Sequence, residues 1–346
     1  MNVTVLSTLW KRASRQPVTN RLTAKFSVWH PRASLPIRAR AAPRGSGAER
    51  ALTDFKAPAL PGLESSFKAR VRSGAATTTI EWTDHTWNPF AGCSRVSEGC
   101  VNCYAERLAN RLEAMGQKTY EGTTTARGKW SGRVNRASAA TFRKPLTLKK
   151  PSLIFVNSMS DFWHPNALDA WRAEAFEVMA ATPQHAYQIL TKRPELVLPT
   201  LARMGISRVP DNVWLGATVE DGRVADRIPH VQRYPAATTF LSIEPMVAQF
   251  GQHDLSGIGW VITGGESGPG ARPSLPDWTR EVRDLCVPAG IPFFHKQWGA
   301  YRNNPLCHEQ GMTSAAAAQL DPHGKGGALL DGILWRDMPA APAVAL

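Results

Sequence analysis

From residue 77 onward, short apolar runs alternate with longer segments of mixed polarity. The runs LIFV, QIL, WLG, FLSI, WVI and FFH are continuous and apolar, as expected for parallel strands that are covered on both faces. The first predicted strand rests on the β-branched run TTTIEW, which leads into a cysteine-rich loop. The pattern predicts seven strands, near residues 78–82, 153–157, 187–191, 213–217, 239–243, 259–263 and 291–295.

The segments between these strands have the spacing of amphipathic helices. The clearest is NCYAERLANRLEAMG, whose large side chains recur at helical spacing: Tyr104, Leu108, Leu112 and Met115. Further helices are predicted over DAWRAEAFEVMAATP and over residues 195–204. The last is PDWTREVRDLCVPAG, in which Pro276 suits the first turn and Gly290 follows the end.

Strands that alternate with helices indicate βαβ units and a parallel sheet with right-handed connections. We therefore expect an α/β protein built as a partial (βα) TIM-like barrel of parallel strands. In such sheets ligands bind at the carboxyl ends of the strands. Charged residues follow most of the predicted strands and are candidates for contacting a ligand: Asp161, Lys192, Arg193, Glu220, Glu244 and Lys296. Any one of them could be a solvated loop residue, but the whole set is harder to explain in that way.

A glycine-rich stretch, GGESGPGARP, follows the strand predicted at 259–263. Such a stretch could form a turn that binds phosphate or carboxylate through backbone amides. It matches neither the G-x-G-x-x-G dinucleotide fingerprint nor the P-loop. The chain also lacks an HExxH motif, a nucleophile elbow and the kinase motifs, which disfavours the corresponding hydrolases and kinases.

The formal net charge of +13 is unevenly distributed along the 346 residues. Residues 1–76 contain 14 Lys and Arg and three acids, whereas the remainder holds 27 bases and 25 acids. The leading segment has no hydrophobic period and is expected to be a basic disordered arm, an organelle transit peptide or an extension from a misplaced start codon. Because the rest of the chain is nearly neutral, the total charge is a weak argument for a nucleic-acid partner.

These features divide the chain into three parts: the basic segment 1–76, a partial barrel with its cysteine loop over 77–303, and a C-terminal tail with a short ordered segment over 304–346. No stretch approaches the roughly 18 apolar residues of a membrane span, so no membrane partner is expected. Five cysteines, three of them close together, do not resemble a secreted disulfide framework. A reducing compartment suits such thiols better, and we expect a cytoplasmic protein.

The most concentrated chemistry lies in EWTDHTWNPFAGCSRVSEGCVNCY, which presents Cys93, Cys100 and Cys103 with the spacing C-x6-C-x2-C. Three thiolates on one loop suit a [4Fe–4S] cluster that keeps one iron without a protein ligand. A zinc ion completed by His85 or His164 is the second interpretation, and three buried free thiols are the third. The cluster is favoured because chance rarely places three cysteines so closely beside paired glycines.

A series of motifs runs in order through the chain: IEWTDHTWNPFAGCSRVSEGCVNCYAERLA, LIFVNSMSDFWH, ILTKRPE, VWLGATVED, FLSIEPM, VITGGESGPGARP, PFFHKQWG and LLDGILWRDMP. Together they resemble the phage gene-product thirty-seven/sixty-eight family, a family of unknown function in bacteriophages and bacteria with a three-cysteine motif. That family is in turn similar to radical S-adenosylmethionine (SAM) enzymes, which have partial (βα)-type barrels and a cluster-binding loop after the first strand. The usual loop of those enzymes is C-x3-C-x2-C, so the first gap is longer here.

The resemblance implies that the cysteines hold a [4Fe–4S] cluster whose open iron binds SAM, and that reduction cleaves SAM. The charged residues at the strand ends would then bind SAM or a substrate that the sequence does not identify. Nearby aromatic residues are candidates for packing over the cluster, although such residues more often belong to the core: Trp82, Trp87, Tyr104 and Trp163. The alternative function is a non-catalytic zinc protein that binds nucleic acid through the basic arm or the RGKWSGRVNR loop.

Overall fold

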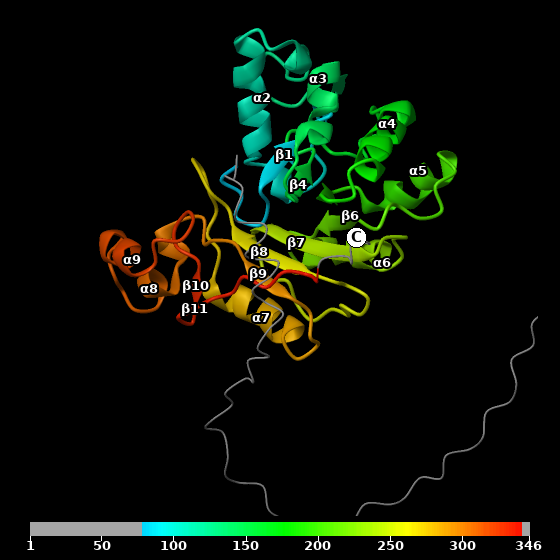
Figure 1. Cartoon of the computed structure of the whole chain (residues 1–346). Coiled ribbons are helices and arrows are strands. Elements are labelled where there is room, and N and C mark those ends of the chain that lie inside the picture. The colour runs from blue at the N-terminus through cyan, green and yellow to red at the C-terminus, as the bar shows by residue number, and fades with distance from the viewer. Residues whose placement is uncertain (1–77, 341–346) are drawn as a thin grey trace, which may run out of the picture. The chain divides into compact units, whose positions relative to one another are not determined.

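A seven-stranded parallel sheet organises the residues that the computed structural model describes, which are 78–340. The segment 1–76, with its expected basic arm, lies outside the described residues. Neighbouring strands follow one another along the chain in the order β1-β4-β5-β6-β7-β8-β9, and the sheet curls into half a barrel (Figure 1). The prediction of an α/β protein with a parallel, partial barrel is therefore confirmed.

The strands of this sheet are β1 (His85–Trp87), β4 (Leu153–Val156), β5 (Ala186–Thr191), β6 (Val213–Thr218), β7 (Thr238–Met246), β8 (Val261–Gly265) and β9 (Phe293–His295). The α-helices are α2 (Tyr104–Ala114), α3 (Ala139–Phe142), α4 (Asp169–Ala180), α5 (Val197–Arg203), α6 (Ile228–Val231), α7 (Pro276–Cys286), α8 (Pro305–His308) and α9 (Ser314–Leu320). Two small antiparallel pairs accompany them, β2 (Phe90–Ala91) with β3 (Asn135–Arg136) and β10 (Leu329–Leu330) with β11 (Ile333–Leu334). Among the described residues, no helix is long and apolar enough to cross a membrane.

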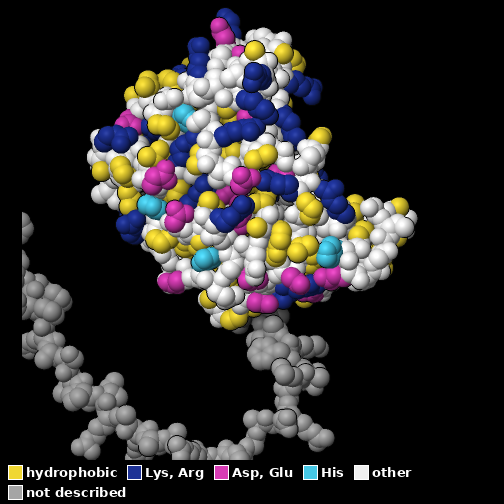
Figure 2. Space-filling model, turned by 180° about the vertical axis from the view of Figure 1, so that it is seen from behind, with side chains coloured by type: hydrophobic (Ala, Val, Ile, Leu, Met, Phe, Trp, Pro, Cys, Tyr) yellow, Lys and Arg dark blue, Asp and Glu magenta, His cyan; other side chains and the backbone are white. Residues whose placement is uncertain are grey.

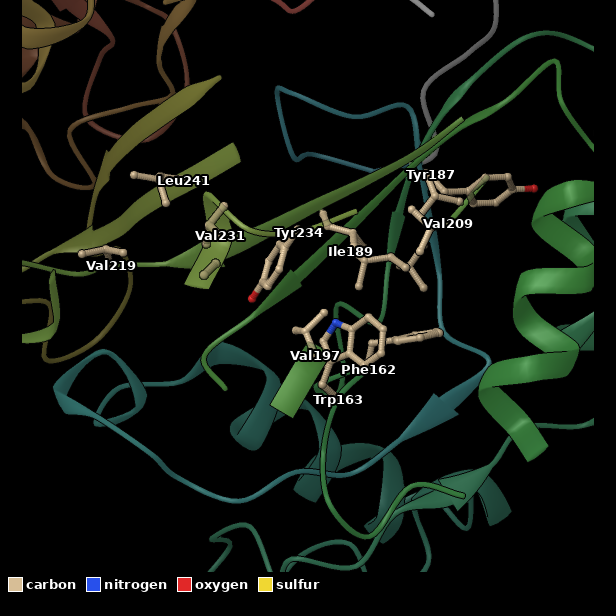
Figure 3. Close-up of a cluster of buried hydrophobic side chains, with 14 of the residues drawn as sticks. Phe162, Trp163, Tyr187, Ile189, Val197, Val209, Val219, Val231, Tyr234 and Leu241 are labelled. Carbon is tan, nitrogen blue, oxygen red and sulfur yellow. The ribbon is translucent and has the colours of Figure 1, made fainter. Parts of the chain in front are cut away.

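Side chains along each strand alternate between the two faces of the sheet, as strand geometry requires. On one face, Tyr187 and Ile189 of β5 join the larger core with residues of α4, α5, α6 and α7 (Figure 3). The opposite, concave face is lined mainly by aromatic side chains: Trp82, Phe155, Trp214, Phe240, Trp260 and Phe294. Several of these rings meet edge to face, with the centroids of Trp214 and Trp260 6.0 Å apart. Aromatic side chains thus fill the middle of the concave face, and the polar groups lie at its rim, at the carboxyl ends of the strands.

The first predicted strand is wrong, whereas the other six overlap the observed strands. Residues 80–83 form a turn in which Thr83 N donates to Ile80 O at 3.3 Å. The strand begins only after Asp84, whose carboxylate accepts a hydrogen bond from Leu153 N at 2.8 Å and so fixes the start of the pairing with β4. The β-branched run before this point has no neighbouring strand among the described residues.

The apolar stripe expected on the first helix is not its buried face. Tyr104 and Met115 are 54% and 62% exposed, whereas Ala105, Glu106 and Ala109 are buried. Small side chains let α2 approach the loop that carries Met159, and together they form a small separate cluster. The helix itself is as predicted, but its packing face is chosen by close approach rather than by apolar size.

Residues 304–340, expected as a tail with a short ordered segment, carry α8, α9 and the β10–β11 pair. They contact the sheet through a backbone bridge between Phe294 and Arg336 and through a hydrogen bond from Trp260 Nε1 to Asp337 O at 2.9 Å. Asp321, which is fully buried, accepts hydrogen bonds from the backbone of Ala328 and Leu329. This part of the chain therefore covers the end of the sheet formed by β8 and β9.

Candidate functional site

The three clustered cysteines lie on the loop between β2 and α2, and Cys103 directly precedes the helix. Gly92 has a φ of 105°, and a Cβ at this position would collide with the backbone of Arg133. A Cβ at Gly99 would collide with the side chain of Glu220. The paired glycines therefore let this loop pack closely against its neighbours, as their lack of a side chain allows.

Cys93, Cys100 and Cys103 line one pocket of about 140 Å³. The pocket lies at the carboxyl ends of three neighbouring strands, which contribute half of the predicted charged residues: Asp161 after β4, and Lys192 and Arg193 after β5. Pocket-lining residues that the sequence did not single out are Ser94, Ser158, Ser160, Thr191 and Thr218. The structure thus brings the cysteine loop and part of the predicted charged set together.

Asp161 and Arg193 form a buried ion pair, with the carboxylate Oδ2 3.1 Å from Nη1 and side chains only 7% and 8% exposed. The carboxylate accepts three further hydrogen bonds, from Thr191 Oγ1 and from the backbone amides of Lys192 and Trp163. The hydrogen bonds that the Asp161 carboxylate accepts therefore all come from donors of the protein itself. This carboxylate orients its neighbours and is saturated by them.

Arg193 connects this pair to the cysteine loop. Its Nη2 donates to both Ser94 O and Ser94 Oγ at 2.8 Å, and its Nη1 lies 3.9 Å from Cys93 Sγ. Burial, followed by the charge of Asp161, raises the pKa of the Cys93 thiol to about 12, although Arg193 opposes both effects. The guanidinium is thus the positive group closest to a candidate ligand sulfur in this network.

His164 is engaged at both ring nitrogens. Asn166 N donates to its Nδ1 at 3.1 Å, so Nε2 carries the proton and donates to Ser94 Oγ at 2.9 Å. Burial, followed by the charge of Arg193, lowers the pKa of His164 to about 4. The imidazole is therefore neutral and forms a hydrogen bond to the cysteine loop. The other candidate histidine, His85, lies in β1 and does not line the pocket.

Glu220, at the end of β6, supports the opposite side of the loop. Its carboxylate accepts a hydrogen bond from Ser97 Oγ and pairs with Arg227 Nη1 at 2.7 Å. Its side chain is only 1% exposed, and it also packs against Gly99. Like Asp161, Glu220 supports the cysteine loop, and the protein itself provides the partners of its carboxylate.

The glycine-rich stretch after β8 also holds the loop. Arg272 donates to both carboxylate oxygens of Glu266 and to Glu98 O, at distances between 2.7 and 3.0 Å. Asn102 Nδ2 donates to Glu266 at 2.9 Å and to Gly270 O at 2.8 Å. Burial tends to raise the pKa of Glu266, but the hydrogen bonds from Arg272 and Asn102 outweigh it and lower that pKa. Asn102 and Arg272 are functional supports that the sequence reasoning missed.

Glu244 and Lys296 meet on the concave side of the sheet, outside the cysteine pocket. Glu244 Oε1 lies 3.2 Å from Lys296 Nζ, and Oε2 accepts from Trp82 Nε1 and Ser242 Oγ at 3.2 Å each. Gly264 leaves room for this carboxylate, since a Cβ there would collide with it. Neither residue lines the cysteine pocket.

Of the four aromatic residues predicted to pack over the cluster, Tyr104 lines this pocket, and its hydroxyl donates to Ser158 O at 3.0 Å. Trp82 belongs to the concave floor, and Trp87 and Trp163 belong to the helix-covered core. Within residues 78–340, no three His, Cys, Asp or Glu side chains stand close enough to hold a single metal ion.

Comparison with known proteins gives one family. The profile of a family described as "Protein of unknown function (DUF5131)" matches residues 77–339. No curated protein and no solved structure matches the chain. The match covers the sheet, the cysteine loop and the described C-terminal elements. The chain therefore belongs to the DUF5131 family of proteins of unknown function.

Proposed function

We propose that the protein is an iron–sulfur enzyme of the radical SAM type, with a [4Fe–4S] cluster held by Cys93, Cys100 and Cys103. The observation that carries the proposal is their common pocket at the carboxyl ends of parallel half-barrel strands, where Lys192 and Arg193 also lie. Ligands of such sheets bind at this edge. The resemblance to the phage gene-product family and to radical SAM enzymes supports the same function. The substrate of the enzyme is left open by these residues.

The contacts of His164 favour a cluster over the zinc alternative, which needs a fourth ligand beside the three thiolates. His164 could complete a zinc site only by giving up its hydrogen bond to Ser94 or to Asn166.

When bound to Cys93, Cys100 and Cys103, such a cluster would supply the electron for reductive cleavage of SAM. The chain's own part is to bind and orient SAM. Lys192 makes no ion pair with any described acid, and its Nζ contacts only Thr218 Oγ1, at 3.3 Å. This ammonium group is therefore the pocket's candidate for binding a carboxylate. Asp161 and Glu220 contribute by fixing the loop.

The test uses the full-length protein, reconstituted anaerobically with iron and sulfide and reduced with dithionite. We expect brown protein that slowly converts SAM to 5′-deoxyadenosine and methionine, which chromatography would detect. Cys103→Ala should abolish both the bound iron and the product. Cys286→Ala is the matched control, because Cys286 is the last residue of α7, is buried in the core and lies outside the loop.

Two results would overturn the proposal. One is a fully loaded cluster that yields no 5′-deoxyadenosine and whose EPR spectrum SAM leaves unchanged. The other is colourless protein that retains a single equivalent of zinc through the same cysteines, which would favour the non-catalytic alternative.

A further inference from the structure

The near-neutral charge of the chain after residue 76 is an average over two different regions. Residues 104–150, here called the basic lobe, contain eleven Lys and Arg and three acids, whereas the other residues from 77 onward contain 16 bases and 22 acids. The basic lobe includes α2 and α3. Figure 2 shows Lys and Arg side chains gathering over the upper part of the molecule, the end at which Figure 1 places these two helices.

Two of the three acids of the basic lobe accept hydrogen bonds from nearby residues of the protein. Glu106 is 2% exposed and accepts from Arg95 and from Trp130 N, and these contacts lower its pKa although burial opposes them. Glu113 accepts from the backbone amides of Gly122 and Thr124, and from the Thr124 hydroxyl, which lowers its pKa as well. These carboxylates hold loops of the lobe, and Glu106 also pairs with Lys129, but most bases of the lobe are left without an acid partner among the described residues.

In contrast to these acids, most Lys and Arg side chains of the lobe are exposed. Eight exposed ones make no ion pair with any described residue: Arg107, Arg111, Lys118, Arg127, Arg133, Arg143, Lys144 and Lys149. Like charges held together in this way repel one another and attract a polyanion. A cationic surface spread over several turns and loops suits an extended chain of anionic groups better than a single small anion.

We propose that the basic lobe binds the phosphate backbone of a nucleic acid. Lys and Arg contacts to phosphates give affinity without base specificity, and the release of counterions makes that affinity strongly dependent on salt. Trp130, a half-buried residue of the same lobe, supplies an aromatic ring of the kind on which unpaired nucleobases stack. This surface lies within the described residues and does not include the basic segment 1–76.

The basic lobe adjoins the cysteine pocket. Trp130 lines that pocket, and Gly132 N donates to Cys93 O at 3.1 Å. A nucleic acid on the lobe would thus lie beside the pocket, and its nucleotides would be the substrate class of the enzyme. This last step rests on the proposed function, whereas binding to the lobe does not, because it needs neither iron nor SAM.

The experiment measures fluorescence anisotropy of a fluorescein-labelled 30-nucleotide RNA and of a 30-base-pair DNA duplex, with the full-length protein in its metal-free form. We compare wild type with two triple variants, Arg111→Gln/Lys118→Gln/Arg127→Gln and Arg143→Gln/Lys144→Gln/Lys149→Gln. At about 100 mM KCl each triple variant should bind about 10- to 100-fold more weakly. The slope of log affinity against log salt should become shallower by about two to three units.

The matched control is Arg208→Gln/Arg233→Gln/Lys325→Gln, which removes three exposed bases outside the lobe and should change affinity less than about twofold. Equal loss in this control would overturn the proposal, since any base would then serve. Unchanged binding in both lobe variants would also overturn it and assign the affinity to other bases of the chain. Binding to phosphatidylserine vesicles is measured for the same variants. If the lobe variants lost binding to these vesicles but not to the nucleic acids, the lobe would be a membrane-binding surface and the proposal would be wrong.

Discussion

Two ion pairs at the carboxyl end of the sheet have the same chemistry and different surroundings. Asp161 and Arg193 are 7% and 8% exposed, and the protein supplies hydrogen bonds to the carboxylate from three further donors. Glu244 and Lys296 are 14% and 21% exposed, lie 3.2 Å apart and face the concave side. The first pair is enclosed between the strands and the cysteine loop, and the second lies partly exposed at the rim of the concave face.

The difference shows how one edge of a sheet can serve two purposes. Burying a charge is costly unless its partner and its hydrogen bonds are in place, so a fully satisfied pair is a rigid support and a poor ligand contact. Through Arg193, the buried pair reaches Ser94 and the vicinity of Cys93. In the partly exposed pair of Glu244 and Lys296, water or a ligand can reach the Lys296 ammonium group. The following predictions test this contrast, beginning with the largest expected effect.

Asp161→Ala should cost about 3–5 kcal/mol of the free energy of unfolding, because it leaves Arg193 charged, buried and without its partner. It also removes the acceptor of Thr191 Oγ1 and of two backbone amides. Urea denaturation followed by circular dichroism would measure the loss. Glu244→Ala is the matched truncation of the other pair and should cost much less. Similar losses in both variants would contradict the contrast.

Acid should weaken the buried network through His164. Its pKa is about 4 in the folded protein, lowered by burial and by Arg193, and about 6.5 when unfolded. Between these values the unfolded chain binds more protons, so stability falls as the pH drops through this window. The loss should reach roughly 2–3 kcal/mol near pH 4.

Denaturation series at several pH values would measure this loss. His164→Gln keeps an amide that can donate to Ser94 Oγ but does not titrate. This variant should lose correspondingly less stability on acidification. An identical pH dependence in wild type and His164→Gln would assign the acid sensitivity to other groups.

Gly99→Ala should destabilise the protein by about 1–3 kcal/mol, because the new methyl group would overlap the side chain of Glu220 in a well-packed site. The cost depends on this one neighbour, so a double-mutant cycle isolates it. In a Glu220→Ala background, where the space is open, Gly99→Ala should cost clearly less. An equal cost in both backgrounds would show that Glu220 does not position the loop at Gly99.

The position of the site could be predicted from sequence, but the partnerships within it could not. Polar residues directly after apolar strands placed Lys192 and Arg193 at one edge, and parallel topology then brought them to the cysteine loop. Nothing in the sequence paired Asp161 with Arg193 or Asn102 with Glu266, which are 32 and 164 residues apart. Such pairing depends on side-chain directions that only the packed structure fixes.

Misplaced elements have the same origin. TTTIEW has strand propensity, yet β1 begins after it because Asp84 anchors the chain to Leu153. In α2 the large side chains outweighed Ala105 and Ala109 in the periodicity, although the small residues make the close contact. Propensity and period describe a segment by itself, and tertiary contacts override them where a neighbour fits better.

Lys296→Met should have the smallest effect on stability, below about 1 kcal/mol. The ammonium group makes one ionic contact and is a fifth exposed, and Glu244 keeps the hydrogen bonds from Trp82 and Ser242 when that contact is lost. Methionine also preserves most of the apolar stem. Urea denaturation should therefore give nearly the wild-type free energy of unfolding, in contrast to Asp161→Ala. If Lys296→Met were instead as damaging as that variant, the rim pair would be a second structural support, and the division of this edge into a fixed and an available pair would fail.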